Sequence, residues 1–132
     1  FIGKTDEEAK AMASQVVAVE SSIAAARMDK VERRDPAKRY NPKNMEEMQS
    51  LTTQVNWVAY FNGIGAENLD NVIVTDLGYF TQLDKLMTDH SIDEIKAYLW
   101  WTLIDGSASQ LTTAMDKANW EFYSKTLRGA VA

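Results

Sequence analysis

A short pattern that starts helices precedes three of the apolar stripes in this chain, and it constrains the fold more than any other feature. In each copy, a residue whose side chain accepts a hydrogen bond is followed three positions later by glutamate. The three pairs are Thr5 with Glu8, Asn44 with Glu47, and Ser91 with Glu94. In such a capping box, each side chain of the pair accepts from the backbone amide of the other residue. The pattern predicts three helix starts spread along the chain.

Apolar residues recur at helical spacing after these starts. The first stripe consists of Ala9, Met12, Ala13, Val16, Val19, Ile23 and Ala26. It predicts one long helix from Thr5 to about Met28, with one apolar face. Shorter stripes predict further helices over residues 45–51, 57–62, 79–87, 92–104 and 115–127. Between the last two, Gly106 and its small polar neighbours predict a bend or break.

These patterns predict a mainly α fold, a multi-helix domain of five or six helices. The only β-branched run of its kind is Val72-Ile73-Val74, so we expect at most a short strand there. A lone strand has unpaired edges, and any sheet here must be small or be completed by another segment. With 132 residues the chain has room for one hydrophobic core, and we expect residues 1–132 to form a single helical domain.

Charge and composition disfavour several classes of partner. The formal net charge is −5, so the long-range field repels phosphate backbones and we expect no nucleic-acid partner. The basic stretch from Lys30 to Arg39 is interrupted by Glu32 and Asp35, which predicts a solvated, salt-bridged turn. No run of about 18 apolar residues is present, so we expect no membrane span. The chain has no cysteine, which excludes disulfides and thiolate metal sites.

The sequence offers no convergent set of catalytic or ligating residues. His90 is the only histidine, so the His-Glu-x-x-His pair of zinc hydrolases cannot be formed. We expect His90 to cap backbone carbonyls or to face water. Adjacent carboxylates such as Glu46 and Glu47 fall in the first turns of predicted helices, where they offset the helix dipole. We therefore predict no catalytic, cofactor-binding or metal-binding residue in this chain.

Four tryptophans, together with nearby tyrosines and phenylalanine, allow two interpretations. They could form a surface that stacks on a peptide or a glycan, or they could fill the core. Trp100 and Trp101 point about 100° apart on a helix, so both cannot lie on one narrow face. We expect one of the two in the core and the other against a neighbouring segment.

Several motifs occur in an order that carries a family resemblance. They are Glu32-Arg33-Arg34-Asp35-Pro36, Tyr40-Asn41-Pro42, Met45-Glu46-Glu47-Met48-Gln49, Trp57-Val58-Ala59-Tyr60, Val72-Ile73-Val74, Lys96-Ala97-Tyr98-Leu99-Trp100-Trp101 and Phe122-Tyr123-Ser124-Lys125-Thr126-Leu127-Arg128-Gly129. This order resembles the amino-terminal, non-catalytic region of the neprilysin and endothelin-converting enzyme family of zinc metalloendopeptidases, which includes bacterial oligoendopeptidase O.

The resemblance implies a role within a larger enzyme. The parent would be a zinc-dependent metalloendopeptidase that hydrolyses oligopeptides. This segment would be part of the helical lobe that walls the cavity and restricts substrate size, inactive alone. The zinc would belong to the parent, with no cofactor in this fragment. Its partners would be the catalytic zinc lobe of the same polypeptide, absent from this chain, and the parent's oligopeptide substrates.

The resemblance also bears on location and on the rival interpretations. The chain starts at Phe1 rather than methionine, and we expect it to be a segment of a longer protein. Animal relatives are extracellular, disulfide-bonded and glycosylated, whereas this chain has neither cysteine nor an Asn-x-Ser/Thr acceptor. We therefore expect a periplasmic or secreted bacterial parent. The alternatives are a free-standing helical module that binds a peptide or glycan, and a small structural or assembly protein.

Overall fold

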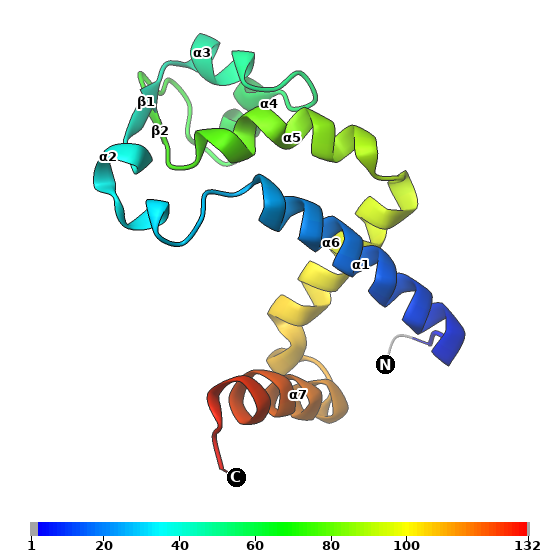
Figure 1. Ribbon diagram of the computed structural model, residues 1–132. Coiled ribbons are helices and arrows are strands. Elements are labelled where there is room, and N and C mark those ends of the chain that lie inside the picture. Colours follow the sequence, from blue (N-terminus) through cyan, green and yellow to red (C-terminus); the bar gives the residue numbers. More distant parts are fainter. Residues whose placement is uncertain (1–2, 132) are drawn as a thin grey trace. The chain divides into compact units, whose positions relative to one another are not determined.

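The computed structural model describes residues 3–131, which form seven α-helices and one small sheet (Figure 1). In chain order the elements are α1 (Asp6–Ala26), η1 (Glu32–Arg34), α2 (Pro36–Arg39), β1 (Asn41–Lys43), α3 (Met45–Ser50), α4 (Trp57–Gly63), β2 (Val72–Val74), α5 (Leu77–Asp89), α6 (Ile92–Ser107), η2 (Ala108–Gln110), α7 (Thr113–Trp120) and the π-helical η3 (Glu121–Thr126). The predicted mainly α fold is confirmed. The helix beyond the predicted five or six is the four-residue α2, which the Asp35-Pro36 pair starts.

The predicted capping boxes at Thr5 and Asn44 form as expected. The Thr5 hydroxyl accepts from the Glu8 amide at 3.2 Å, and the Glu8 carboxylate accepts from the Thr5 amide at 2.8 Å. Asn44 and Glu47 exchange the same two hydrogen bonds at 2.8 and 2.9 Å. The predicted third start is also correct in position, since α6 begins at Ile92. Local sequence therefore fixes these helix starts.

The short strand predicted at Val72–Val74 is present as β2, and its partner is β1. The two strands are antiparallel, with Asn41 opposite Val74, Pro42 opposite Ile73 and Lys43 opposite Val72. Among residues 3–131 this is the complete sheet. It is small, as the single β-branched run predicts.

The chain folds as two compact units, and each is described by itself below. One comprises the described residues up to Val19 together with those from Ile92 onward, and the other is Glu20–Ser91. Helix α1 contributes residues to both. That residues 1–132 form one domain stays a prediction.

The core of the unit Glu20–Ser91 is built around Trp57. Buried Met48 of α3, Trp57 of α4 and Val74 of β2 form its centre. The Trp57 ring lies 5.4 Å from the Phe80 ring of α5 between centroids, and 5.8 Å from that of Tyr60. Trp57 is only 8% exposed, because residues of α3, β2 and α5 all pack around it.

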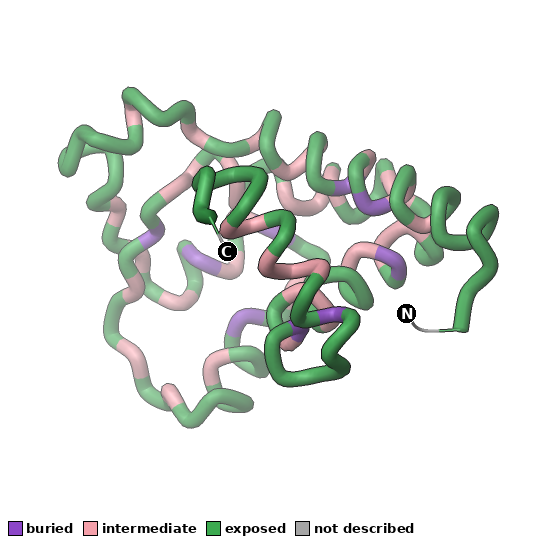
Figure 2. Tube along the Cα trace, turned by 90° about the horizontal axis from the view of Figure 1, so that it is seen from below, coloured by how far each residue is buried: buried purple, intermediate pink, exposed green. Residues whose placement is uncertain are grey.

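The other unit buries smaller side chains. Its buried residues include Val16 and Val19 of α1, Ala97 of α6, and Met115 of α7. Tyr123 of η3 donates a hydrogen bond from its hydroxyl to Asp105 of α6 at 2.8 Å. In both units the buried stretches are short and most of the trace is exposed or intermediate (Figure 2).

Candidate interaction surfaces

Asp84 of α5 organises the loop between α3 and α4. Its carboxylate accepts from the hydroxyl of Thr52, from the amide and hydroxyl of Thr53, both at 2.7 Å, and from the amide of Gln54 at 3.0 Å. Thr52 is 1% exposed. These hydrogen bonds hold the pKa of Asp84 well below its ordinary value. The largest contribution comes from the Thr52 hydroxyl, and the next from the Thr53 backbone amide.

Gln49 of α3 fixes the other side of the same loop. Its amide nitrogen donates to the carbonyls of Thr52 at 3.1 Å and Val55 at 2.9 Å. Its amide oxygen accepts from the Trp57 backbone amide at 3.0 Å, at the start of α4. One side chain therefore satisfies three backbone groups that the loop would otherwise leave unpaired.

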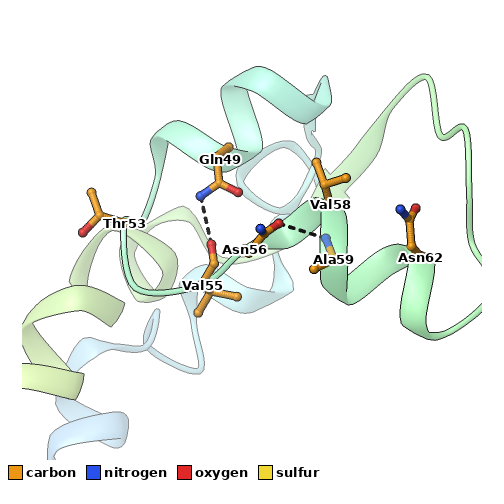
Figure 3. A pocket seen from close by; sticks show the side chains of 7 residues that line it. All are labelled: Gln49, Thr53, Val55, Asn56, Val58, Ala59 and Asn62. Atoms are coloured by element: carbon orange, nitrogen blue, oxygen red, sulfur yellow. Dashed lines mark hydrogen bonds between the residues drawn. The ribbon is translucent and has the colours of Figure 1, made fainter.

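A shallow hollow of about 600 Å³ opens beside this loop (Figure 3). It is lined by Gln49, Thr53, Val55, Asn56, Val58, Ala59 and Asn62. Most of its polar side chains already hold the backbone: Asn56, for example, accepts from the Ala59 amide at 2.9 Å and caps α4. Among the polar side chains that line the hollow, only that of Asn62 forms no hydrogen bond within the described chain. Because most of its polar side chains are used by the fold, we do not regard the hollow as a ligand site.

Helix α6 exposes large apolar side chains on one face. Ile92, Leu99 and Leu103 lie within about 40° of one another around the helix, and Leu103 is 65% exposed. The buried position of this helix is Ala97. An apolar stripe on a helix is typically covered by another element. The bare stripe Ile92–Leu99–Leu103 is therefore a candidate interaction surface.

The prediction for the two adjacent tryptophans of α6 is wrong. Trp100 is 55% exposed and Trp101 is 41% exposed, so neither lies in a core. Both follow Ala97 by three or four positions and so lie on its side of the helix, but only the small Ala97 is buried there, and the larger indoles keep much of their surface exposed. Together with Leu99 and Leu103 they extend the apolar surface of the helix.

The basic stretch from Lys30 to Arg39 forms a turn in which the acidic side chains are used internally. Glu32 pairs with Lys38 at 2.5 Å, and this bond raises the pKa of Lys38. The Asp29 carboxylate accepts from the amides of Val31 and Glu32, and Asp35 accepts from that of Ala37. The predicted salt-bridged turn is confirmed for Glu32 and Lys38. The arginines of this stretch are exposed.

His90 closes α5 and contacts a serine. It is the C-cap of that helix, and its Nε2 lies 2.8 Å from the Ser22 hydroxyl of α1. Within residues 3–131, no group of three or more His, Cys, Asp or Glu side chains could hold a metal ion. That the chain carries no catalytic, cofactor-binding or metal-binding residue stays a prediction. No described helix is long and apolar enough to span a bilayer.

Sequence reasoning missed the side chains that join distant segments. Asp76 caps α5 by accepting from the Tyr79 amide at 3.1 Å, and its other oxygen accepts from the Met28 amide at 2.9 Å, just after α1. Its place before a helical stripe gives a signal for the cap. No local signal exists for the bond to Met28 or for the bonds of Asp84, because their partners lie about 30 to 50 positions away.

The sequence of this chain is similar to those of known peptidases. The profile of peptidase family M13, in its amino-terminal part, matches residues 1–131. Neprilysin-11 of Caenorhabditis elegans is 19% identical over 126 residues, which is 90% of this chain and 15% of that protein. Human endothelin-converting enzyme 1 is 25% identical over 127 residues, 92% of this chain and 16% of that protein.

Solved structures show the same fold over nearly the whole chain. The zinc metalloprotease Zmp1 of Mycobacterium tuberculosis in its open state matches with a TM-score of 0.91 and 27% identity, over 99% of this chain and 21% of that one. Its complex with an inhibitor matches with a TM-score of 0.89 over 98% of this chain. The chain thus spans about a fifth or less of the length of these relatives.

The resemblance inferred from the ordered motifs is thereby confirmed. The match covers both compact units, and it extends from the first helix through η3. This chain therefore belongs to peptidase family M13 and corresponds to the amino-terminal region of its members.

Proposed function

We propose that this chain is a non-catalytic helical part of a neprilysin-like zinc metalloendopeptidase that hydrolyses oligopeptides. In the parent it forms a wall of the cavity and restricts the size of substrates, and it is inactive alone. The observation that carries this proposal is the match of the whole chain to one fifth of a zinc metalloprotease. Restriction by a helical lobe would exclude folded proteins and admit flexible peptides.

The bare stripe on α6 supports a partner within the same polypeptide. Moving exposed apolar side chains such as Leu99 and Leu103 out of water is favourable by roughly 25 cal/mol per Å² of buried apolar area. A parent several times longer than this chain has ample polypeptide to cover them. We infer that the catalytic lobe of the parent is the partner of this region.

The residues present do not fit a zinc site. The single histidine caps α5 and contacts Ser22, and the described chain has no cluster of side chains that could ligate a metal. Zinc, which structural and catalytic sites bind through several His, Cys, Asp or Glu ligands, would be held by another part of the parent. No chemical step is assigned to this chain.

The place of action follows from the same reasoning. We infer a bacterial parent that is periplasmic or secreted: the family resemblance implies a secreted peptidase, and a chain without cysteine is unlike the disulfide-bonded animal members. Its substrates would be oligopeptides. Fractionation of the native host followed by detection of the full-length protein tests this, and recovery from the cytosol alone would contradict it.

The gene and one assay test the proposed function. The open reading frame that contains residues 1–132 should also encode His-Glu-x-x-His downstream. The full-length protein should cleave a quenched oligopeptide in a zinc-dependent, chelator-sensitive reaction, whereas residues 1–132 alone with excess zinc should not. Sustained chelator-sensitive cleavage by residues 1–132 would overturn the proposal.

The rival is a free-standing helical module that binds a peptide or glycan. The exposed indoles of Trp100 and Trp101 favour it, since such rings stack on peptides and sugars. A reading frame that ends close to Ala132, together with saturable peptide or glycan binding lost in Trp100→Ala, would establish the rival instead.

A further inference from the structure

The register of the two strands determines which backbone groups are free. In an antiparallel ladder, facing residues alternate between pairs that exchange two hydrogen bonds and pairs that exchange none. Pro42 has no amide hydrogen, so the pair of Pro42 with Ile73 belongs to the second kind. The amide and carbonyl of Ile73 therefore point away from β1, toward the outer edge of β2.

That outer edge carries no partner within the described chain. Ile73 is 47% exposed, and its neighbours on the same side of the extended segment, Asn71 and Thr75, are exposed as well. No hydrogen bond to any residue in 3–131 satisfies the backbone of Asn71 or Thr75. A row of unpaired amides and carbonyls beside a β-branched sequence is a ready template for another strand.

The opposite edge of the sheet is closed to such pairing. On β1, the outward position is that of Pro42, which offers a carbonyl but no donor. The Asn41 side chain also donates to the carbonyls of Lys38 and Val74, each at 2.9 Å, and so seals the end of the ladder next to α2. Only the β2 edge can accept a further strand.

We propose that the outer edge of β2 receives a third strand, supplied by the part of the parent polypeptide outside residues 1–132. The strand runs along Asn71, Ile73 and Thr75 and pairs with their backbone groups. This inference rests on the proposed function, because it requires the longer parent. It names a contact between this region and the rest of the enzyme that involves backbone pairing as well as apolar packing.

A segment of the same polypeptide fits this edge better than a separate molecule. Three-residue strands in a two-stranded ribbon are marginal in stability, and a third strand makes such a sheet substantially more stable. About four fifths of a relative such as Zmp1 lies outside the matched region. A covalently attached strand is present at high effective concentration, whereas a substrate or a second copy is not.

Hydrogen exchange of the full-length protein tests the proposal. Exchange is measured with residue resolution on a dilute sample without added peptide, and zinc-dependent cleavage is measured on the same preparation. We expect the Ile73 amide to exchange at least about tenfold more slowly than an unstructured amide, although it points away from β1. Amides of Val72 and Val74, which lie on the inner side, provide the protected reference.

A proline variant sharpens the test. Ile73→Pro removes the outward amide but none of the inner ladder bonds, and Ile73→Val retains the amide as the matched control. Ile73→Pro should accelerate exchange at Asn71 and Thr75 at least about tenfold while Val72 and Val74 stay protected. If the variant also loses the inner pair, the exchange of the unmodified protein decides alone.

The outcomes separate this inference from the proposed function. Fast exchange of Ile73 in a preparation that cleaves peptide would overturn the third strand and leave the proposed function intact. Protection that appears only with added oligopeptide, or only at high protein concentration, would overturn it in favour of a substrate or a second copy. Absence of zinc-dependent cleavage would overturn the proposed function and the parent-derived strand together.

Discussion

The loop between α3 and α4 and the helix α6 differ in how far other residues of this chain cover them. In the loop, Gln49 and Asp84 satisfy the backbone, and Trp57 beside it is 8% exposed. On α6, Trp100 and Leu103 remain more than half exposed. The first region is completed by residues of this chain. The second keeps large apolar side chains exposed, as the proposed contact with the catalytic lobe of a longer parent requires.

Truncating one tryptophan in each region gives the largest test of this contrast. Trp57→Ala should lower the free energy of unfolding by about 3–5 kcal/mol, because it removes the centre of an aromatic core. Trp100→Ala should change it by no more than about 0.5 kcal/mol. Urea denaturation of residues 1–132 measures both, and similar losses in the two variants would remove the distinction.

Replacing Asp84 tests whether the carboxylate completes the loop. Asp84→Asn should lower the Tm at neutral pH, because a charged acceptor of four hydrogen bonds is lost. The folded pKa of Asp84 lies below its ordinary value of 3.8, so its contribution is present above that pH and decreases as the pH falls further.

The measurement is the Tm of both proteins from pH 7 to pH 3. The difference between wild type and Asp84→Asn should be constant near neutrality and should shrink below about pH 4. Asp70→Asn serves as the control, since Asp70 is exposed and its side chain forms no hydrogen bond within residues 3–131. A difference that is independent of pH would contradict the assignment.

Removing a cap tests the local part of the same region. Asn44→Ala should lower the free energy of unfolding by about 1 kcal/mol, because the amide of Glu47 loses its acceptor at the start of α3. Asn62→Ala, on the exposed side of α4, should cause no loss. An equal effect of the two substitutions in thermal or chemical denaturation would show that the cap is not stabilising.

The smallest effect is expected on the bare face of α6. Leu99→Gln combined with Leu103→Gln should change the unfolding free energy of residues 1–132 by less than about 0.5 kcal/mol per site, and should reduce self-association measured by light scattering. In the full-length protein the same pair should lower the Tm. An unchanged Tm there would show that this stripe stays uncovered in the parent.

Much of the fold could be predicted from local sequence. Capping at Thr5 and Asn44 appears in the structure at those positions, since each cap involves groups only three residues apart. The break after α6 follows from Gly106 and its small polar neighbours. The number of helices was predicted less well, because the four-residue α2 is near the limit of what a helix can be.

The sequence by itself determined where helices start, where the one strand lies, and that this chain resembles a non-catalytic part of a peptidase. Only the tertiary structure decided that Asp84 holds residues 52–54, that Asp76 joins Met28 to α5, and that both tryptophans of α6 stay exposed. The physical reason is range: a cap or a turn depends on neighbours within about four positions, whereas burial and long-range hydrogen bonds depend on which distant segments meet.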